Sequence, residues 1–247
     1  MGAFEMSIPK IIHYCWFGGK PLPKKSRKLI ATWEKNLPDY EIKLWDETAF
    51  DMAESEYVKA AYEAGKFAFV SDYVRLCALQ KYGGIYLDTD VEVVRDFTEL
   101  LEGCSAVFGF ESEEKVMTAF IAAEPEHPII REFLGRYENK AFDAADLEPN
   151  TVALTDILQR RGLVINNEMQ RIGEDVAVFP LAYFQAYDFS TAQLRITDHT
   201  RTIHRCFGSW CSPKEQLIFA VKRTLGKCLS EKGYSSLKGI KKKLMGE

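Results

Sequence analysis

The stretch from Gly83 to Val94 constrains this chain more than any other, because a short apolar run ends there in two closely spaced aspartates. The run 85–87, entered through two glycines, is typical of a buried strand. Side chains alternate along a strand, so Asp88 and Asp90 are predicted to project to the same side. The carboxyl ends of strands are where ligands bind in open α/β sheets, which makes this the first candidate site.

Two readings of the aspartates are open. Carboxylates at the end of a buried strand repel each other, and a hard divalent cation such as Mg²⁺ or Mn²⁺ removes that cost. This reading predicts that Asp88 and Asp90 belong to a metal–diphosphate site. The other reading is a strand that ends in a solvated acidic turn, and an Asp-x-Asp pattern alone favours it.

Composition limits the class of protein. The chain has 247 residues, of which 47% are apolar and 28% charged, as is ordinary for a soluble globular protein with a full core. A net charge of −4 gives no support for nucleic-acid binding by the whole molecule. No apolar stretch approaches the roughly 20 residues that span a bilayer, and residues 1–9 lack a signal-peptide pattern. We therefore expect a cytoplasmic protein with no nucleic-acid partner.

The N-terminal part predicts a strand over 8–16, a basic amphipathic helix over 21–36 and a second strand over 40–45. Trp16 ends the first strand and is followed by Phe-Gly-Gly, which breaks it. An aromatic ring at that position can stack on a flat ring such as a nucleobase. It can equally be a core tryptophan, since tryptophan is usually largely buried.

A helical stretch from Tyr57 to Tyr82 leads into the aspartate motif. Ser71 and Asp72 suit a helix start within it, and Gly83 suits its end. Asp72 and Arg75 are three residues apart, so they share a helix face. We expect that face to point away from the core, and for an isolated pair the sequence favours a surface ion pair of little energetic value.

A second polar and aromatic stretch runs from Arg201 to Trp210. His204 is a candidate third metal ligand, or a satisfied histidine near the surface. Ser209 and Trp210 can donate hydrogen bonds, which suits a phosphate oxygen.

The six cysteines are scattered without C-x-x-C spacing and favour free thiols. Cys15 and Cys77 lie in apolar segments and are interpreted as small buried hydrophobes. A zinc site is a weak alternative because its spacings match no zinc template. Its members would be His199, His204, Cys206 and Cys211.

After Gln216 the chain becomes basic and partly amphipathic. Such a segment can lie on an anionic membrane surface, where each basic residue adds about 1 kcal/mol. A solvated helical tail is an equal alternative.

Three stretches together resemble the DXD-containing glycosyltransferase family. Residues 11–19 form one of them, residues 69–75 carry Ser-Asp-x-x-Arg, and residues 82–90 carry Gly-Gly-x-Tyr-x-Asp-x-Asp. The family includes the yeast initiating mannosyltransferase and bacterial capsular-polysaccharide transferases. The pattern is also similar to the glucosylating domain of large clostridial toxins.

The resemblance implies a GT-A fold, which is an α/β fold with a mixed central sheet of Rossmann-like βαβ units flanked by helices. It would occupy residues 1–216, with residues 217–247 as a basic tail. Family members use a nucleotide-sugar donor with Mn²⁺ or Mg²⁺ and retain the anomeric configuration. The bacterial relatives imply a saccharide or lipid-linked acceptor in surface polysaccharide synthesis. Peripheral contact with the inner face of the membrane is a further expectation.

The resemblance also assigns roles by position. Asp88, Asp90 and His204 would be the metal ligands, with Asp90 the firmer one. Asp72 and Arg75 would act in catalysis together with Asp88 and Asp90. The donor-binding set would be Tyr14, Trp16, Ser71, Asp72, Arg75, Asp88, Ser209 and Trp210.

Two other functions remain open on the sequence alone. The run 87–91 superficially fits the opening motif of a haloacid-dehalogenase-type phosphatase, in which the first aspartate, here Asp88, is a nucleophile. That motif normally begins near the N-terminus, whereas 87 residues precede Asp88. The other function is a nucleotide-sugar-binding module without catalysis, which would not need the paired acids.

Overall fold

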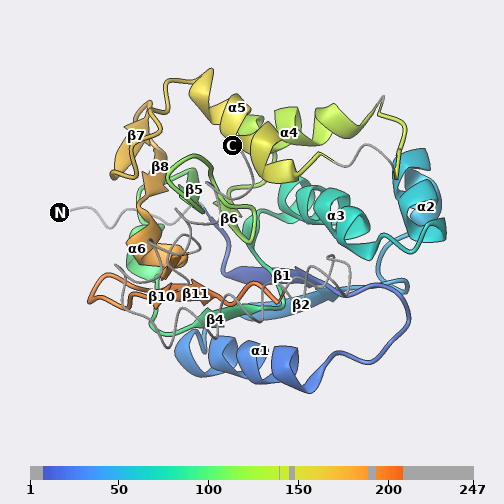
Figure 1. Ribbon diagram of the computed structural model, residues 1–247, viewed down its shortest axis with the longest axis horizontal. Coiled ribbons are helices and arrows are strands. Elements are labelled where there is room, and N and C mark those ends of the chain that lie inside the picture. Colours follow the sequence, from blue (N-terminus) through green and yellow to red (C-terminus); the bar gives the residue numbers. More distant parts are fainter. Residues whose placement is uncertain (1–7, 139, 145–147, 189–192, 208–247) are drawn as a thin grey trace, which may run out of the picture.

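The computed structural model describes residues 8–138, 140–144, 148–188 and 193–207. Its centre is a seven-stranded sheet with the strand order β2-β1-β3-β6-β5-β8-β7 (Figure 1). The strands of this sheet are β1 (Ile11–Cys15), β2 (Glu41–Trp45), β3 (Gly84–Leu87), β5 (Ala106–Gly109), β6 (Phe120–Ala123), β7 (Gln170–Ile172) and β8 (Val176–Phe179).

The sheet is mixed. β1 pairs in parallel with β2 and β3, and β5 pairs in parallel with β8, while β6 and β7 run antiparallel to their neighbours. Strands β1, β2 and β3 therefore end at the same edge of the sheet. Side chains that follow these three strands are brought together, which is the condition for a ligand site at the carboxyl ends.

Helices cover both faces of the sheet. They are α1 (Lys24–Asn36), α2 (Glu56–Glu63), α3 (Phe67–Tyr82), α4 (Pro128–Glu138), α5 (Asn150–Gln159) and the short α6 (Leu181–Phe184). Figure 1 shows α1 on one side and α2 to α5 on the other. Each side has its own apolar core, one around Trp33 and one around Val74 and Phe133. The predicted α/β class with a mixed sheet flanked by helices is confirmed, and it is the arrangement expected of a GT-A fold.

Two small sheets and two 3-10 turns complete the described structure. β4 (Val91–Val93) pairs antiparallel with β11 (Thr202–His204), and β9 (Tyr187–Asp188) pairs with β10 (Gln193–Leu194). The 3-10 turns are Met52–Glu54 and Thr98–Leu100. The β4–β11 pair matters for function, because it brings residues more than a hundred positions apart in the sequence beside the end of β3.

The two glycines before β3 are required by close backbone contacts. Gly83 ends α3 at a φ of +61° and donates its N–H to the Leu79 carbonyl, as predicted for a helix end. A Cβ there would lie 2.7 Å from the backbone nitrogen of Pro125, and one at Gly84 would lie 2.5 Å from the Ile11 carbonyl oxygen. The chain can therefore turn from α3 directly into the centre of the sheet only without side chains.

The predicted helix start at Ser71 is wrong. α3 begins at Phe67, and the Ser71 hydroxyl donates to the Phe67 carbonyl inside the helix. Both faces of α3 are covered, since the helix packs against β1 and against α2 and α4. The apolar residues at its start, which make this packing possible, outweigh the preference of serine and aspartate for a helix terminus.

The described cysteines, at 15, 77, 104 and 206, carry free thiols, as expected. Cys15 is buried and Cys77 half-buried. Within the described ranges, no helix has the length and apolar character that a membrane crossing requires. The predicted tail over 217–247 lies outside the described residues.

A buried histidine joins β1 to the end of β2 and to the turn that precedes β3. His13 of β1 accepts a hydrogen bond on Nδ1 from the Trp45 indole (3.1 Å) and donates from Nε2 to the Gly83 carbonyl (2.9 Å). Both contacts need the neutral ring with its proton on Nε2. Burial, together with the charge of Lys43, lowers the pKa of His13 to about 4, although the bond to Gly83 opposes the shift.

We expect His13 to make folding sensitive to mild acid. In the unfolded chain a histidine titrates near 6.5, so below that pH the unfolded state binds a proton that the folded state excludes. Stability falls from pH 6.5 towards pH 4, by about 3 kcal/mol in total from this residue. Urea unfolding of wild type and His13→Leu at several pH values measures the effect, since the variant loses this slope whatever its absolute stability. His199→Gln, at an exposed histidine, keeps the wild-type slope.

Candidate active site

The two aspartates lie in a turn that connects the central sheet to the small one. β3 ends at Leu87, so Asp88 and Asp90 are not strand residues. The prediction that strand alternation places them on one side is therefore wrong. The Val91 N–H closes the turn by donating a hydrogen bond to the Asp88 carbonyl. The Asp88 N–H donates to the Ala119 carbonyl, which connects the turn to the residue just before β6. Both carboxylates nevertheless face the same region, because the turn and not the pleat brings them together.

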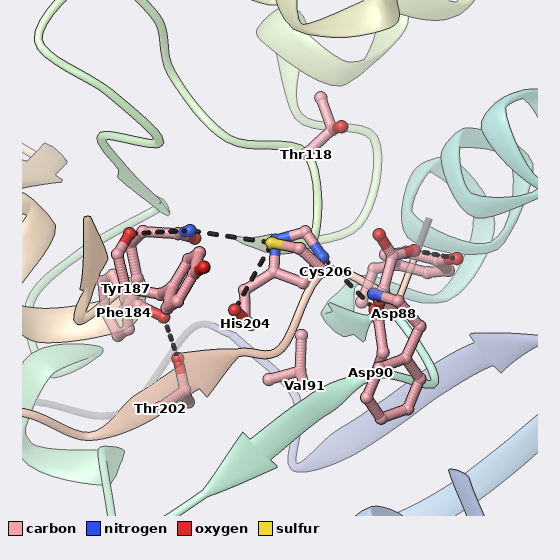
Figure 2. Close-up of polar contacts among 12 residues, drawn as sticks. Asp88, Asp90, Val91, Thr118, Phe184, Tyr187, Thr202, His204 and Cys206 are labelled. Carbon is pink, nitrogen blue, oxygen red and sulfur yellow. Dashed lines mark hydrogen bonds and ion pairs between the residues drawn. The ribbon is translucent and has the colours of Figure 1, made fainter. Parts of the chain in front are cut away.

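The β4–β11 pair brings His204 to this turn. His204 is in register with Val91, and its Nε2 lies 3.2 Å from Asp90 Oδ1. The other Asp90 oxygen accepts the Phe207 N–H at 2.7 Å. Figure 2 shows Asp88, Asp90 and His204 converging above β4 and β11. The structure thus places the predicted third ligand beside the two predicted carboxylate ligands.

These three side chains could hold a divalent cation. One ligand atom from each of Asp88, Asp90 and His204 lies within 4.8 Å of the others. Across the described ranges it is the one group of three or more such residues that has this geometry. The carboxylates suit Mg²⁺ or Mn²⁺, and three protein ligands leave positions for diphosphate oxygens. The side chains are between 12 and 28% exposed, so the group is neither sealed nor fully solvated.

Asp90 and His204 form a charged pair in the structure. Burial raises the pKa of Asp90, but the His204 ring and the Phe207 N–H outweigh it and hold that pKa below its usual value. Burial lowers the pKa of His204, while Cys206 and Asp90 raise it well above its usual value overall. His204 Nδ1 is buried and has no hydrogen-bond partner among the described residues. Without a bound cation, Asp90 is therefore a carboxylate and the His204 ring keeps its proton. A cation that binds His204 would have to displace that proton.

Asp72 and Arg75 form a buried pair, so the predicted surface pair that points away from the core is wrong. Arg75 is 4% exposed, and its Nη2 lies 2.7 Å from Asp72 and 3.4 Å from Asp88. Its Nη1 donates to the Thr118 carbonyl and its Nε to the Ser71 carbonyl. The guanidinium also lies 4.4 Å from the centre of the Tyr86 ring. Arg75 therefore holds the α3 carboxylate and the end of β3 together.

Asp72 has the ionisation properties of a site residue. Burial raises its pKa to about 6, with Asp88 adding to the shift and Arg75 opposing it. Its Oδ1 accepts a hydrogen bond from the Asn150 amide at 2.6 Å, and the Thr118 hydroxyl donates to the other atom of that amide at 2.8 Å. This network fixes the carboxylate. Perturbed carboxyl groups with defined partners are frequent at functional sites.

Three residues of this network are absent from the sequence-based prediction. Tyr86 donates its hydroxyl to Asp88 at 2.9 Å, although its place in an apolar run indicated only a core residue. Asn150 and Thr118 carry no local signal, because they reach Asp72 and Arg75 from distant segments. The Tyr-x-Asp spacing alone could have indicated Tyr86.

Among the predicted donor-binding residues, Trp16 lies at the carboxyl end of β1. It is half-buried, and its indole donates to the Lys20 carbonyl at 2.6 Å. Tyr14 is also half-buried, but its ring packs edge-on against Trp33 on the α1 side of the sheet. Ser71 contributes its carbonyl to Arg75. Ser209 and Trp210 lie outside the described residues.

The zinc alternative gains no support among the described residues. His199 stacks on the Tyr183 ring and does not group with His204 and Cys206. Cys211 lies outside the described residues.

Part of the chain is similar to known proteins. Residues 23–106 match the family described as the glycosyltransferase sugar-binding region containing the DXD motif. Inositol phosphoceramide mannosyltransferase 3 of Schizosaccharomyces pombe is 35% identical over 99 residues, which are 38% of this chain and 28% of that protein. An uncharacterized glycosyltransferase of Acanthamoeba polyphaga mimivirus is 27% identical over 132 residues, 49% of this chain and 52% of that one. The chain thus spans about half or less of the length of these relatives.

Among solved structures, the PaToxG glycosyltransferase is similar at 23% identity and a TM-score of 0.48, over 62% of this chain and 68% of that one. The region that matches the family model, residues 23–106, contains the Asp72–Arg75 pair and both aspartates of the turn, which are residues that the geometry singles out. Residues 23–106 of this chain thus match the family of glycosyltransferase sugar-binding regions that contain a DXD motif.

Proposed function

We propose that the chain is a metal-dependent glycosyltransferase that moves a sugar from a nucleotide-sugar donor, of the UDP class, to a saccharide or lipid-linked acceptor. One observation carries the proposal. The Asp88, Asp90 and His204 group lies directly beside the buried Asp72–Arg75 pair, with Asp88 contacted by Arg75 at 3.4 Å. In this proposal a place for a diphosphate adjoins a place for a sugar, and Asp72, Arg75, Asp88 and Asp90 all lie inside the family region.

The chemistry follows from charge. Breaking the bond between sugar and phosphate leaves negative charge on the diphosphate and positive charge on the sugar ring. A divalent cation, when bound, supplies positive charge to the leaving diphosphate. Asp72 faces the ring charge and accepts sugar hydroxyls, while Asn150 and Arg75 keep its carboxylate in place. Arg75 is fully engaged with protein groups, so it acts mainly by positioning Asp72 and Asp88.

The stereochemical course is part of the proposal. Asp72 is already bound by Asn150 and Arg75, and we assign no covalent nucleophile. We therefore propose that the acceptor hydroxyl attacks the face from which the diphosphate leaves, so that the anomeric configuration is retained. The new bond joins the acceptor oxygen to the anomeric carbon, and the departing phosphate oxygen takes the hydroxyl proton.

Donor hydrolysis tests this function without knowledge of the acceptor. Purified protein is incubated with a panel of UDP- and GDP-sugars, with and without Mn²⁺, and the released nucleotide is measured. We expect release from one UDP-sugar with Mn²⁺ and none after chelation. Phosphate release from small phosphoesters would favour the phosphatase instead. Nucleotide binding with neither hydrolysis nor transfer would favour a binding module.

The biological setting is also part of the proposal. The family resemblance suggests bacterial surface polysaccharide synthesis in the cytoplasm, and the basic composition of residues 217–247 suggests contact with the inner membrane face. Sedimentation of the chain with anionic vesicles, compared with a variant that ends at residue 216, measures that contact.

A further inference from the structure

The loop that follows β1 is held by one carboxylate from the end of β2. Glu47 Oε1 accepts the N–H of Gly18 at 2.6 Å, the N–H of Gly19 at 3.1 Å and the Tyr62 hydroxyl at 3.0 Å. Glu47 itself is exposed, so it adds little to the core. Its three bonds all serve to join the loop to β2 and to α2.

The backbone conformation at Gly18 and Gly19 suits the binding of an anion. Gly18 and Gly19 have φ values of +100° and +64°, and successive N–H groups in such a turn form a concave site that binds anions. A Cβ at Gly18 would lie 2.5 Å from the Phe67 ring, so the turn is also closely packed against α3. Burial raises the pKa of Glu47, but the bonds from backbone N–H groups and from Tyr62 outweigh it and lower that pKa. Glu47 therefore fills the concave site as a charged carboxylate at neutral pH.

The same loop fixes the orientation of the Trp16 indole. Trp16 Nε1 donates to the Lys20 carbonyl at 2.6 Å, and Lys20 directly follows the two glycines that Glu47 binds. The backbone of Trp16 is held separately, by its N–H on the Trp45 carbonyl at 2.9 Å. Loss of the Glu47 carboxylate would thus free the Lys20 carbonyl and the indole, while β1 and β2 stay paired.

We propose that Glu47 is the positioning residue for nucleobase recognition, acting through the Gly18–Gly19 turn on the Trp16 ring. This inference rests on the proposed function, together with the expectation from the sequence that Trp16 stacks on the base of the donor. Glu47 contacts no part of the substrate. Glu47 holds the Trp16 ring in its binding orientation before the nucleotide arrives, so binding does not lose conformational entropy by ordering the ring.

A double-mutant cycle tests the proposal. UDP affinity is measured by calorimetry in the presence of Mn²⁺ for wild type, Glu47→Ala, Trp16→Ala and the double variant. Glu47→Ala should weaken binding about tenfold, and it should have no further effect once Trp16 is alanine. Glu47→Gln keeps an oxygen that can accept the three bonds but removes the charge, so its affinity should lie between those of wild type and Glu47→Ala. Glu63→Ala, at an exposed glutamate of α2, is the matched control and should change nothing. Additive effects of the two alanine substitutions would overturn the proposal.

A ligand-free measurement separates this inference from the proposed function. Exchange of the Trp16 indole N–H with solvent, followed by NMR in the absence of nucleotide, should be several-fold faster in Glu47→Ala than in wild type or Glu63→Ala. Unchanged exchange would overturn the positioning role even in an active enzyme. Faster exchange in a protein that binds no nucleotide would uphold the positioning of the Trp16 ring by Glu47 and reject the proposed function.

Discussion

Replacing Asp90 with asparagine should reduce donor turnover by about 10²–10³-fold or more, the range for loss of one group that stabilises charge in a transition state. Asp90 is the residue that links the two halves of the site, with one oxygen 3.2 Å from His204 and the other on the Phe207 N–H. Asparagine keeps the shape and one acceptor oxygen but removes the charge that a cation needs. The decrease should appear in the Mn²⁺-dependent release of nucleotide, together with weaker Mn²⁺ binding by calorimetry.

The control for this variant is Asp39→Asn, at an exposed aspartate in the turn before β2. It changes the net charge equally and should leave turnover and Mn²⁺ binding as they are. Circular dichroism and urea unfolding establish that the Asp90 variant is folded. A folded Asp90→Asn protein with wild-type turnover at ordinary Mn²⁺ concentration would remove this residue from the metal site.

The sequence predicted the central elements because their signals are local. The first strand, the basic helix and the second strand are present at nearly the expected residues, and the Gly-Gly before β3 marks a real close approach of backbones. These predictions needed only the properties of a short window of sequence. The grouping of Asp72, Arg75, Asp88 and Asp90 came instead from the family resemblance, and the structure brings the Asp72–Arg75 pair next to Asp88.

The environment of those residues could not be predicted in the same way. Whether Asp72 and Arg75 lie on the surface depends on α4 and on Asn150, which come 50 or more residues later in the chain. His204 was a candidate ligand, but only the pairing of β11 with β4 brings it to Asp90. The burial of a residue and its contact partners are set by tertiary structure. For Asp72 and Arg75, tertiary packing outweighs the local preference of charged residues for an exposed helix face.

Replacing Arg75 with methionine should destabilise the protein by about 3–5 kcal/mol, because it leaves the Asp72 carboxylate buried without its partner. Four groups lose a donor at once, since the guanidinium contacts Asp72, Asp88 and the carbonyls of Ser71 and Thr118. Methionine retains an apolar stem of similar length but lacks the guanidinium that lies over the Tyr86 ring. Urea unfolding at pH 8 measures the loss, and Arg27→Met, at an exposed arginine of α1, should change stability by less than about 0.5 kcal/mol.

The charge of Asp72 determines how the loss of stability in Arg75→Met depends on pH. The folded-state pKa of Asp72 is already raised to about 6 in the presence of Arg75, and removal of the cation raises it further. As the pH falls, the variant can therefore protonate Asp72 and escape the cost of a buried charge, so the deficit should be smaller at pH 5 than at pH 8. Adding Asp72→Asn to Arg75→Met should recover part of the stability at pH 8 without restoring turnover. An equal deficit at both pH values, with no recovery in the double variant, would show that packing and not charge accounts for the role of Arg75.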